Sequence, residues 1–173
     1  SIVYSVDDNF TTNFMTLLNR LPIFPLYYEG KTKFAPIHCS DLTDVIINII
    51  SNNVNSKIIE CVGPEIISFK EILEKLLNLI GKKRLLIPIP LPLAQLSARF
   101  FEVMPKPILT RDQLKLLKYD NVLSGKYKSN TDIGVPSLRY FDEEVKKYCY
   151  MWREGGQFST EKYNPDNIDI KTG

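Results

Sequence analysis

Residues 33–45 read Lys-Phe-Ala-Pro-Ile-His-Cys-Ser-Asp-Leu-Thr-Asp-Val, and this stretch indicates the fold more strongly than any other part of the chain. A short apolar strand from Phe34 to Cys39 runs directly into a helix. Ser40 or Asp41 can cap that helix, because either side chain accepts hydrogen bonds from the free N–H groups of the first turn. The apolar residues of the helix recur on one face, which we expect to be buried: Leu42, Val45, Ile46, Ile49 and Ile50.

The rest of the chain alternates short apolar runs with helical periodicity. In chain order, the pattern predicts a strand over 1–4, a helix over 11–21 stopped by Pro22, a hairpin of strands 24–28 and 33–39 around Glu29-Gly30, a buried parallel strand over 57–62, a short strand at 66–67, a helix from Ser68 to Gly81, a strand over 85–87, helices over 91–104 and from Thr110, a loop-rich segment over 121–136, and a final helix over 141–153. After Phe158 we expect a mobile polar tail.

The composition is that of an ordinary globular domain, with 44% hydrophobic and 24% charged residues among 173. The net charge of +2 gives no general nucleic-acid signal, because binding DNA or RNA usually needs a concentrated basic face, and we expect no nucleic-acid partner. The three cysteines are widely spaced and indicate reduced, buried thiols: Cys39, Cys61 and Cys149. With a single histidine we expect no metal site.

No apolar run reaches the roughly 20 residues that span a bilayer. The chain opens directly in a strand without a secretory leader, so we expect a piece of a longer protein.

Tyr27 and Lys31 form a Tyr-x-x-x-Lys pair, the motif that dehydrogenases use for catalysis. In those enzymes one helical turn stacks the two side chains, so that the ammonium lowers the pKa of the phenol. Here the pair lies between Pro25 and Gly30 in the predicted hairpin, so we assign it no catalytic role. The sequence also contains no glycine-rich phosphate-binding loop.

His38 is the most tempting functional residue, and two interpretations are open. It is either a catalytic group or a strand residue that hydrogen-bonds a neighbour such as Asp41. We favour the structural role, because no second histidine, cysteine or nucleophile completes a catalytic set nearby. Asp41 and Asp44 are more simply cap and first-turn residues than acid–base partners. The aromatic pair Phe100-Phe101 is either helix core or part of an apolar pocket or membrane-facing patch.

Residues 33–45 resemble the Phe-x-Pro-Ile/Val-His-Val-x-Asp-Leu/Val segment in the second half of extended short-chain dehydrogenase/reductases. Other segments resemble one atypical branch of that family, the Rossmann-type nucleotide-binding accessory subunit of respiratory complex I with its alphaproteobacterial relatives. These segments, in chain order, are Ser1 to Tyr4, Asp8 to Phe10, Leu109 to Val122, Ile133 to Pro136 and Tyr150 to Phe158. The likeness covers about residues 1–158. Ser5-Val6 departs from it, since a Gly-Pro turn is usual there.

The resemblance implies an α/β fold, with late strands of a parallel Rossmann sheet and a small, mostly helical C-terminal substrate domain. Residues 1–65 would end the NAD(P)-binding Rossmann domain, 66–158 would form a substrate and docking domain, and 159–173 the tail. It also implies NADP(H) or NAD(H) as the cofactor of the full-length protein, with Ser1 and Ile2 as the contacts left to this chain. The implied substrate cleft is lined by Phe10, Phe14, Phe34 and His38. No catalytic residue is assigned.

Two functions from different classes remain open on this resemblance. One is a non-catalytic or weakly catalytic accessory subunit of NADH:ubiquinone oxidoreductase with a structural or assembly role. Its partners would be complex I subunits, with the membrane surface or quinone nearby, and its location would be cytoplasmic and peripheral to the inner membrane. The alternative is a free-standing NAD(P)-dependent epimerase, dehydratase or reductase acting on a sugar nucleotide or an isoprenoid or quinone precursor.

Overall fold

The computed structural model describes residues 1–54, 58–90 and 116–156, and all structural statements refer to these. The described helices and strands are, in chain order, β1 (Val3–Tyr4), α1 (Thr11–Arg20), β2 (Ile23–Leu26), the 3₁₀ turn η1 (Tyr27–Gly30), β3 (Lys33–Phe34), β4 (Ile37–His38), α2 (Cys39–Ser51), β5 (Ile59–Glu60), β6 (Ile67–Ser68), α3 (Phe69–Leu79), β7 (Leu85–Pro88), β8 (Lys128–Ser129), α6 (Phe141–Lys146) and the 3₁₀ turn η2 (Cys149–Trp152). Three predictions lie outside the described residues: the helix over 91–104, the Phe100-Phe101 pair and the tail after Phe158. The helix predicted from Thr110 also begins outside them.

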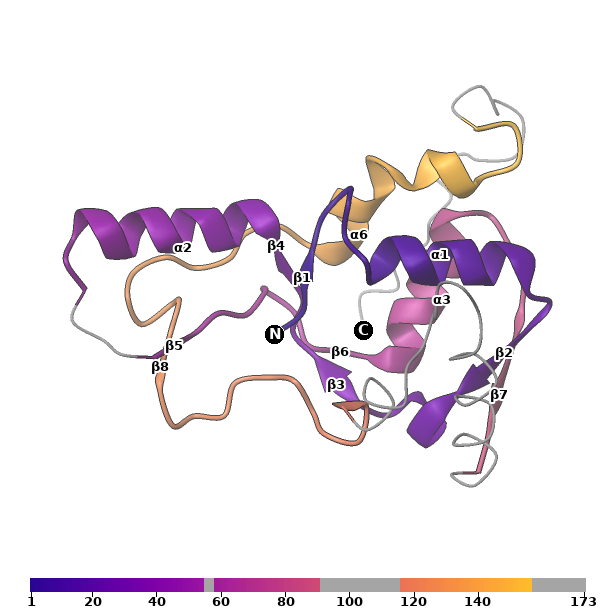
Figure 1. Cartoon of the computed structure of the whole chain (residues 1–173), viewed down its shortest axis with the longest axis horizontal. Coiled ribbons are helices and arrows are strands. Elements are labelled where there is room, and N and C mark those ends of the chain that lie inside the picture. Colours follow the sequence, from indigo (N-terminus) through magenta and orange to yellow (C-terminus); the bar gives the residue numbers. More distant parts are fainter. Residues whose placement is uncertain (55–57, 91–115, 157–173) are drawn as a thin grey trace.

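The strands form two-stranded pairs, most of which join segments far apart in the sequence (Figure 1). β1 pairs with β4, β2 with β7, and β5 with β8, all in parallel, while β3 and β6 are antiparallel. Parallel pairs separated by helices are typical of an α/β fold, so the predicted fold class is confirmed.

The predicted hairpin around Glu29-Gly30 is wrong. β2 does not pair with the strand that follows it but lies in register with β7, with Ile23 opposite Leu85. The intervening turn η1 holds Tyr28 and Glu29 in left-handed backbone conformations, with φ of 50° and 58°. The turn signal was therefore correct, but a turn does not specify which strand the chain pairs with after it.

The core lies between α1, α3, β2 and the C-terminal segment that contains α6 and η2 (Figure 1). Both long core helices begin as expected. Ser68 and Glu71 form a reciprocal capping box at α3, with the Ser68 hydroxyl 3.2 Å from the Glu71 nitrogen. At α1, the Asp8 carboxylate accepts the N–H groups of Phe10 and Thr11. The predicted helix over 141–153 is instead divided into α6 and η2.

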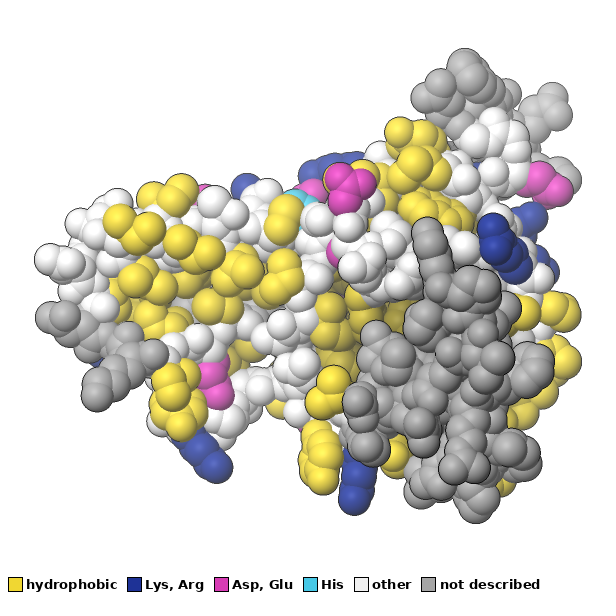
Figure 2. All heavy atoms as spheres, viewed as in Figure 1, with side chains coloured by type: hydrophobic (Ala, Val, Ile, Leu, Met, Phe, Trp, Pro, Cys, Tyr) yellow, Lys and Arg dark blue, Asp and Glu magenta, His cyan; other side chains and the backbone are white. Residues whose placement is uncertain are grey.

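The helix α2 forms where predicted, but its cap and its buried face differ from the expectation. His38, rather than Ser40 or Asp41, is the cap, because its Nδ1 accepts the Ser40 N–H at 3.2 Å. Val45 is buried, yet Ile46 and Ile50 are 48% and 74% exposed. Figure 2 shows apolar side chains gathered over this helix, which with β5 and β8 extends to one side of the core in Figure 1.

Candidate functional site

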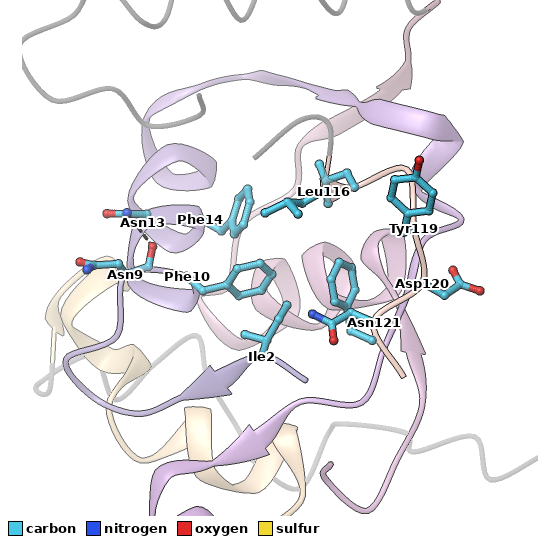
Figure 3. Close-up of a pocket in the computed structure, with 11 residues that line it drawn as sticks. Ile2, Asn9, Phe10, Asn13, Phe14, Leu116, Tyr119, Asp120 and Asn121 are labelled. Carbon is cyan, nitrogen blue, oxygen red and sulfur yellow. Dashed lines mark hydrogen bonds between the residues drawn. The ribbon is translucent and has the colours of Figure 1, made fainter. Parts of the chain in front are cut away.

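A cavity of about 380 Å³ opens between the start of α1, β3 and the segment 116–121 (Figure 3). Its floor is apolar and largely aromatic, and its rim carries amide side chains and one carboxylate. The described residues that line it are Ile2, Asn9, Phe10, Asn13, Phe14, Phe34, Leu116, Leu117, Tyr119, Asp120 and Asn121.

Three phenylalanines give the cavity its shape. Phe10 and Phe14 lie one helical turn apart at the start of α1, so their rings meet edge to face with centroids 4.9 Å apart. Phe34 comes from β3, and its ring centroid lies 6.1 Å from that of Phe10. Behind them Phe69 contacts both Phe14 and Phe34, which fixes the floor against α3.

Hydrogen bonds from a distant part of the chain hold the other wall in place. The Asn121 N–H donates to the Lys33 carbonyl at 2.7 Å, and the Ala35 N–H donates to the Asn121 carbonyl at 3.3 Å. The Lys33 N–H donates to the Asp120 carboxylate at 2.8 Å. Because these bonds use the backbone of residue 121, they leave its side-chain amide available to the cavity.

Most of the predicted site residues meet at this cavity. Ile2, Phe10, Phe14 and Phe34 all line it. Ser1 lies beside it, where its hydroxyl donates to the Asn121 carbonyl at 2.7 Å. The structure thus brings the expected cofactor-side and substrate-side residues together, while their roles toward a ligand stay predictions.

His38 lies elsewhere, away from the lining of the cavity. Its Nε2 is 3.9 Å from a carboxylate oxygen of Glu144 on α6, and its ring packs edge-on against Tyr4 with centroids 5.3 Å apart. Burial lowers the pKa of His38 below its ordinary value of 6.5, and the nearby Glu144 carboxylate opposes that shift. Asp41, the partner first expected for His38, is instead held by the guanidinium of Arg139. His38 therefore connects α2 to α6.

The Tyr27 and Lys31 side chains do not stack as a catalytic pair requires. Tyr27 is buried, whereas Lys31 is exposed and pairs with Glu29. The left-handed backbone of Tyr28 and Glu29 interrupts any helical turn between them. Among the described residues, no three His, Cys, Asp or Glu side chains gather as a metal site. None of the described helices has the length and hydropathy that crossing a bilayer requires.

The residues that sequence reasoning missed are the polar rim and the wall from 116 to 121. Asn9 and Asn13 could have been found, because each directly precedes one of the phenylalanines assigned to the cleft, Phe10 and Phe14. Nothing local marks Asp120 or Asn121, which reach the cavity only through pairing with β3.

No family model matches the chain. Two curated proteins do, both described as NADH dehydrogenase [ubiquinone] 1 alpha subcomplex subunit 9, mitochondrial. The one from Dictyostelium discoideum is 23% identical over 96% of this chain and 47% of its own length. The one from Arabidopsis thaliana is 24% identical over 87% of this chain and 40% of its own length.

The solved structures with a similar fold include two nucleotide-sugar reductases. A dTDP-4-dehydrorhamnose reductase from Clostridium acetobutylicum matches 87% of the chain with a TM-score of 0.56 and 16% identity. A GDP-mannoheptose C4 reductase from Campylobacter jejuni, described with NADP bound, matches the same share with a TM-score of 0.55 and 17% identity. The chain shares the fold of these two reductases.

This likeness confirms the predicted Rossmann-type α/β fold and agrees with the family resemblance of residues 33–45. The chain spans only part of the reductase fold, since it covers 46% of either reductase. It also spans less than half the length of the two curated relatives.

Proposed function

We propose that this chain is the second half of an NADP(H)-binding accessory subunit of NADH:ubiquinone oxidoreductase, with a structural or assembly role and little or no catalysis. One observation carries the proposal: both curated relatives are described as that subunit, and the match extends over nearly the whole chain.

The described lining of the cavity offers no site for the phosphates of a nicotinamide nucleotide. Ile2 lies on the cavity wall with Ser1 beside it, and none of the described lining residues is a lysine or arginine. The sequence also lacks a glycine-rich loop, so the phosphates would be held by parts of the full-length protein outside this chain. When bound, the nucleotide would supply a redox-active ring, or in a structural role a rigid support for the cleft.

The exposed apolar face of α2 supports the proposal that this chain is about half of a longer protein. Monomeric proteins rarely leave a row such as Ile46, Ile47 and Ile50 open to water, because covering it is favourable. The two relatives and the two reductases are each more than twice as long as the part this chain matches. We propose that the remainder of the full-length protein, continuing the parallel sheet at β1 and β4, covers this face.

Deletion of the gene for the full-length protein in its native cells tests the accessory-subunit role. We expect less assembled NADH:ubiquinone oxidoreductase, seen as a weaker NADH dehydrogenase band on a native gel, and recovery when the full-length protein is restored. An unchanged amount of assembled enzyme would contradict the proposal.

The alternative is a free-standing reductase, epimerase or dehydratase, which the fold of the two nucleotide-sugar reductases favours. Complementation separates the two functions. If the full-length protein carries an upstream Tyr-x-x-x-Lys, replacing that tyrosine by phenylalanine leaves assembly intact in an accessory subunit. In the free-standing enzyme, the same change abolishes turnover and the cellular function together.

A further inference from the structure

We propose that the cavity between α1 and residues 116–121 binds a neutral, mostly apolar molecule that carries a ring and one hydrogen-bond-accepting oxygen. This deepens the proposed function, in which these residues form the substrate side of the cleft, and it rests on that assignment. It separates the two substrate classes left open above, because a prenylated or aromatic ring compound fits the cavity and a sugar nucleotide does not.

The charge of the described lining residues disfavours anionic ligands. A nucleotide sugar carries two phosphates, which proteins hold with arginine, lysine or a helix N-terminus. None of the described lining residues is cationic, and the rim carries the Asp120 carboxylate. The N-terminal turn of α1 is also occupied, since the Asp8 carboxylate already accepts the first N–H groups of that helix. Among the described lining residues, an anion would therefore find no positively charged partner.

The floor of the cavity favours a planar apolar group. The ring centroid of Phe10 lies 4.9 Å from that of Phe14 and 6.1 Å from that of Phe34. A ligand ring placed among them can stack edge-to-face or offset at similar distances, which is favourable for aromatic rings. The volume of about 380 Å³ lies within the range of small-molecule sites. Leu116 and Leu117 extend the apolar surface beyond the phenylalanines, which gives room for an alkyl chain.

Asn121 supplies the polar contact. Figure 3 shows its side-chain amide turned toward Ile2 and Phe10, whereas the Asp120 carboxylate points away from them. No described residue takes a hydrogen bond from this amide, because the bonds that fix residue 121 use its backbone. The amide NH₂ can thus donate to a carbonyl or hydroxyl oxygen of the ligand.

Titration of the 173-residue chain with two matched probes tests this proposal. 4-Pentylacetophenone is neutral with a ring, a carbonyl and a short tail, and 4-pentylbenzoate has the same shape with a negative charge. Amide chemical shifts in NMR spectra report both the affinity and the site. We expect the ketone to bind at least about tenfold more tightly than the benzoate, with shifts concentrated at Phe10, Asn13 and Asn121.

Substitutions at residue 121 then test the role of the amide. Asn121→Leu should weaken ketone binding by about three- to tenfold, because one hydrogen bond is lost. Asn121→Lys should bring the benzoate into the cavity at least as tightly as the ketone. The matched control is Asn19→Leu, which makes the same change at an exposed position on the far end of α1 and should leave both affinities unchanged.

Several results would overturn the inference. Tighter binding of UDP-glucose or the benzoate than of the ketone would reject the neutral ligand class. Tighter binding of nicotinamide mononucleotide would assign the cavity to the cofactor. If Asn121→Leu and Asn19→Leu change the affinity for the ketone equally, the Asn121 amide does not contact the ligand. These titrations use the chain alone, so they can fail while gene deletion still supports the accessory-subunit role.

Discussion

Gly63 should tolerate no side chain at all, because it packs directly against the backbone of the segment that defines the fold. A Cβ atom built on Gly63 would lie 1.7 Å from the Pro36 carbonyl oxygen and 2.7 Å from its carbon. Contacts below 3.0 Å are not made by real Cβ atoms, so one of the two backbones must move by well over an ångström. The close approach, rather than a left-handed conformation, requires glycine here.

The cost of Gly63→Ala follows from the hydrogen bonds that such a movement breaks. The Gly63 N–H donates to the Ala35 carbonyl at 3.0 Å, and the Ile37 N–H donates to the Ile2 carbonyl at 2.8 Å. Leaving two partly buried backbone pairs unsatisfied costs about 4 kcal/mol in the free energy of unfolding. For a chain of this length, that lowers the melting temperature by about 12 °C.

Thermal unfolding followed by circular dichroism measures this effect, with Gly81→Ala as the matched control. Gly81 has a φ of +67° and nothing within 4 Å of an added Cβ, so the control carries only backbone strain. That strain amounts to about 1 kcal/mol, or about 3 °C. If Gly63→Ala melts no lower than Gly81→Ala, the contact between residue 63 and Pro36 is not as described.

Three further predictions concern charge, pH and the exposed face. Arg139→Ala should lower the free energy of unfolding by about 2 kcal/mol, measured by urea denaturation, because Asp41 is 3% exposed and loses its guanidinium partner. Because the pKa of His38 is lower in the folded state, the unfolded chain takes up a proton at a higher pH than the folded chain does. Stability is therefore full above about pH 6.5 and falls as the pH drops toward the folded pKa. His38→Gln should flatten this part of the pH–melting curve, and an unchanged curve would contradict the assignment. Ile50→Glu should leave the melting temperature of this chain within about 1 °C and raise its solubility, since Ile50 is exposed. The same change should destabilise the full-length protein, where we propose that this face is covered.

Local chemistry made much of the fold predictable. The cap at Ser68, the stop at Pro22 and the apolar spacing of the helices are properties of neighbouring residues, and α1 and α3 form where these signals place them. The family resemblance assigned Phe10, Phe14 and Phe34 to one cleft, and the structure brings these three residues together. His38, assigned to the same cleft, does not line the cavity, and a role of any of them toward a substrate stays a prediction.

Features that depend on distant partners were not predictable. A turn at Glu29-Gly30 is visible in the sequence, but it does not reveal that β2 pairs with β7, which lies far along the chain beyond α3. The same holds for Asn121, which reaches the cavity through hydrogen bonds to Lys33 and Ala35. Helical periodicity shows that α2 has an apolar face, yet it does not show whether anything in this chain covers that face.

Copurification tests the central proposal most directly. The full-length protein, tagged at its C-terminus and isolated from detergent-solubilised membranes, should bring NADH:ubiquinone oxidoreductase activity with it in a fixed ratio to the tag. A tagged Gly63→Ala variant should bring down less of this activity, because the fold that docks is disrupted. Recovery of the tagged protein in quantity without any such activity would contradict the proposal that this chain belongs to an accessory subunit of that enzyme.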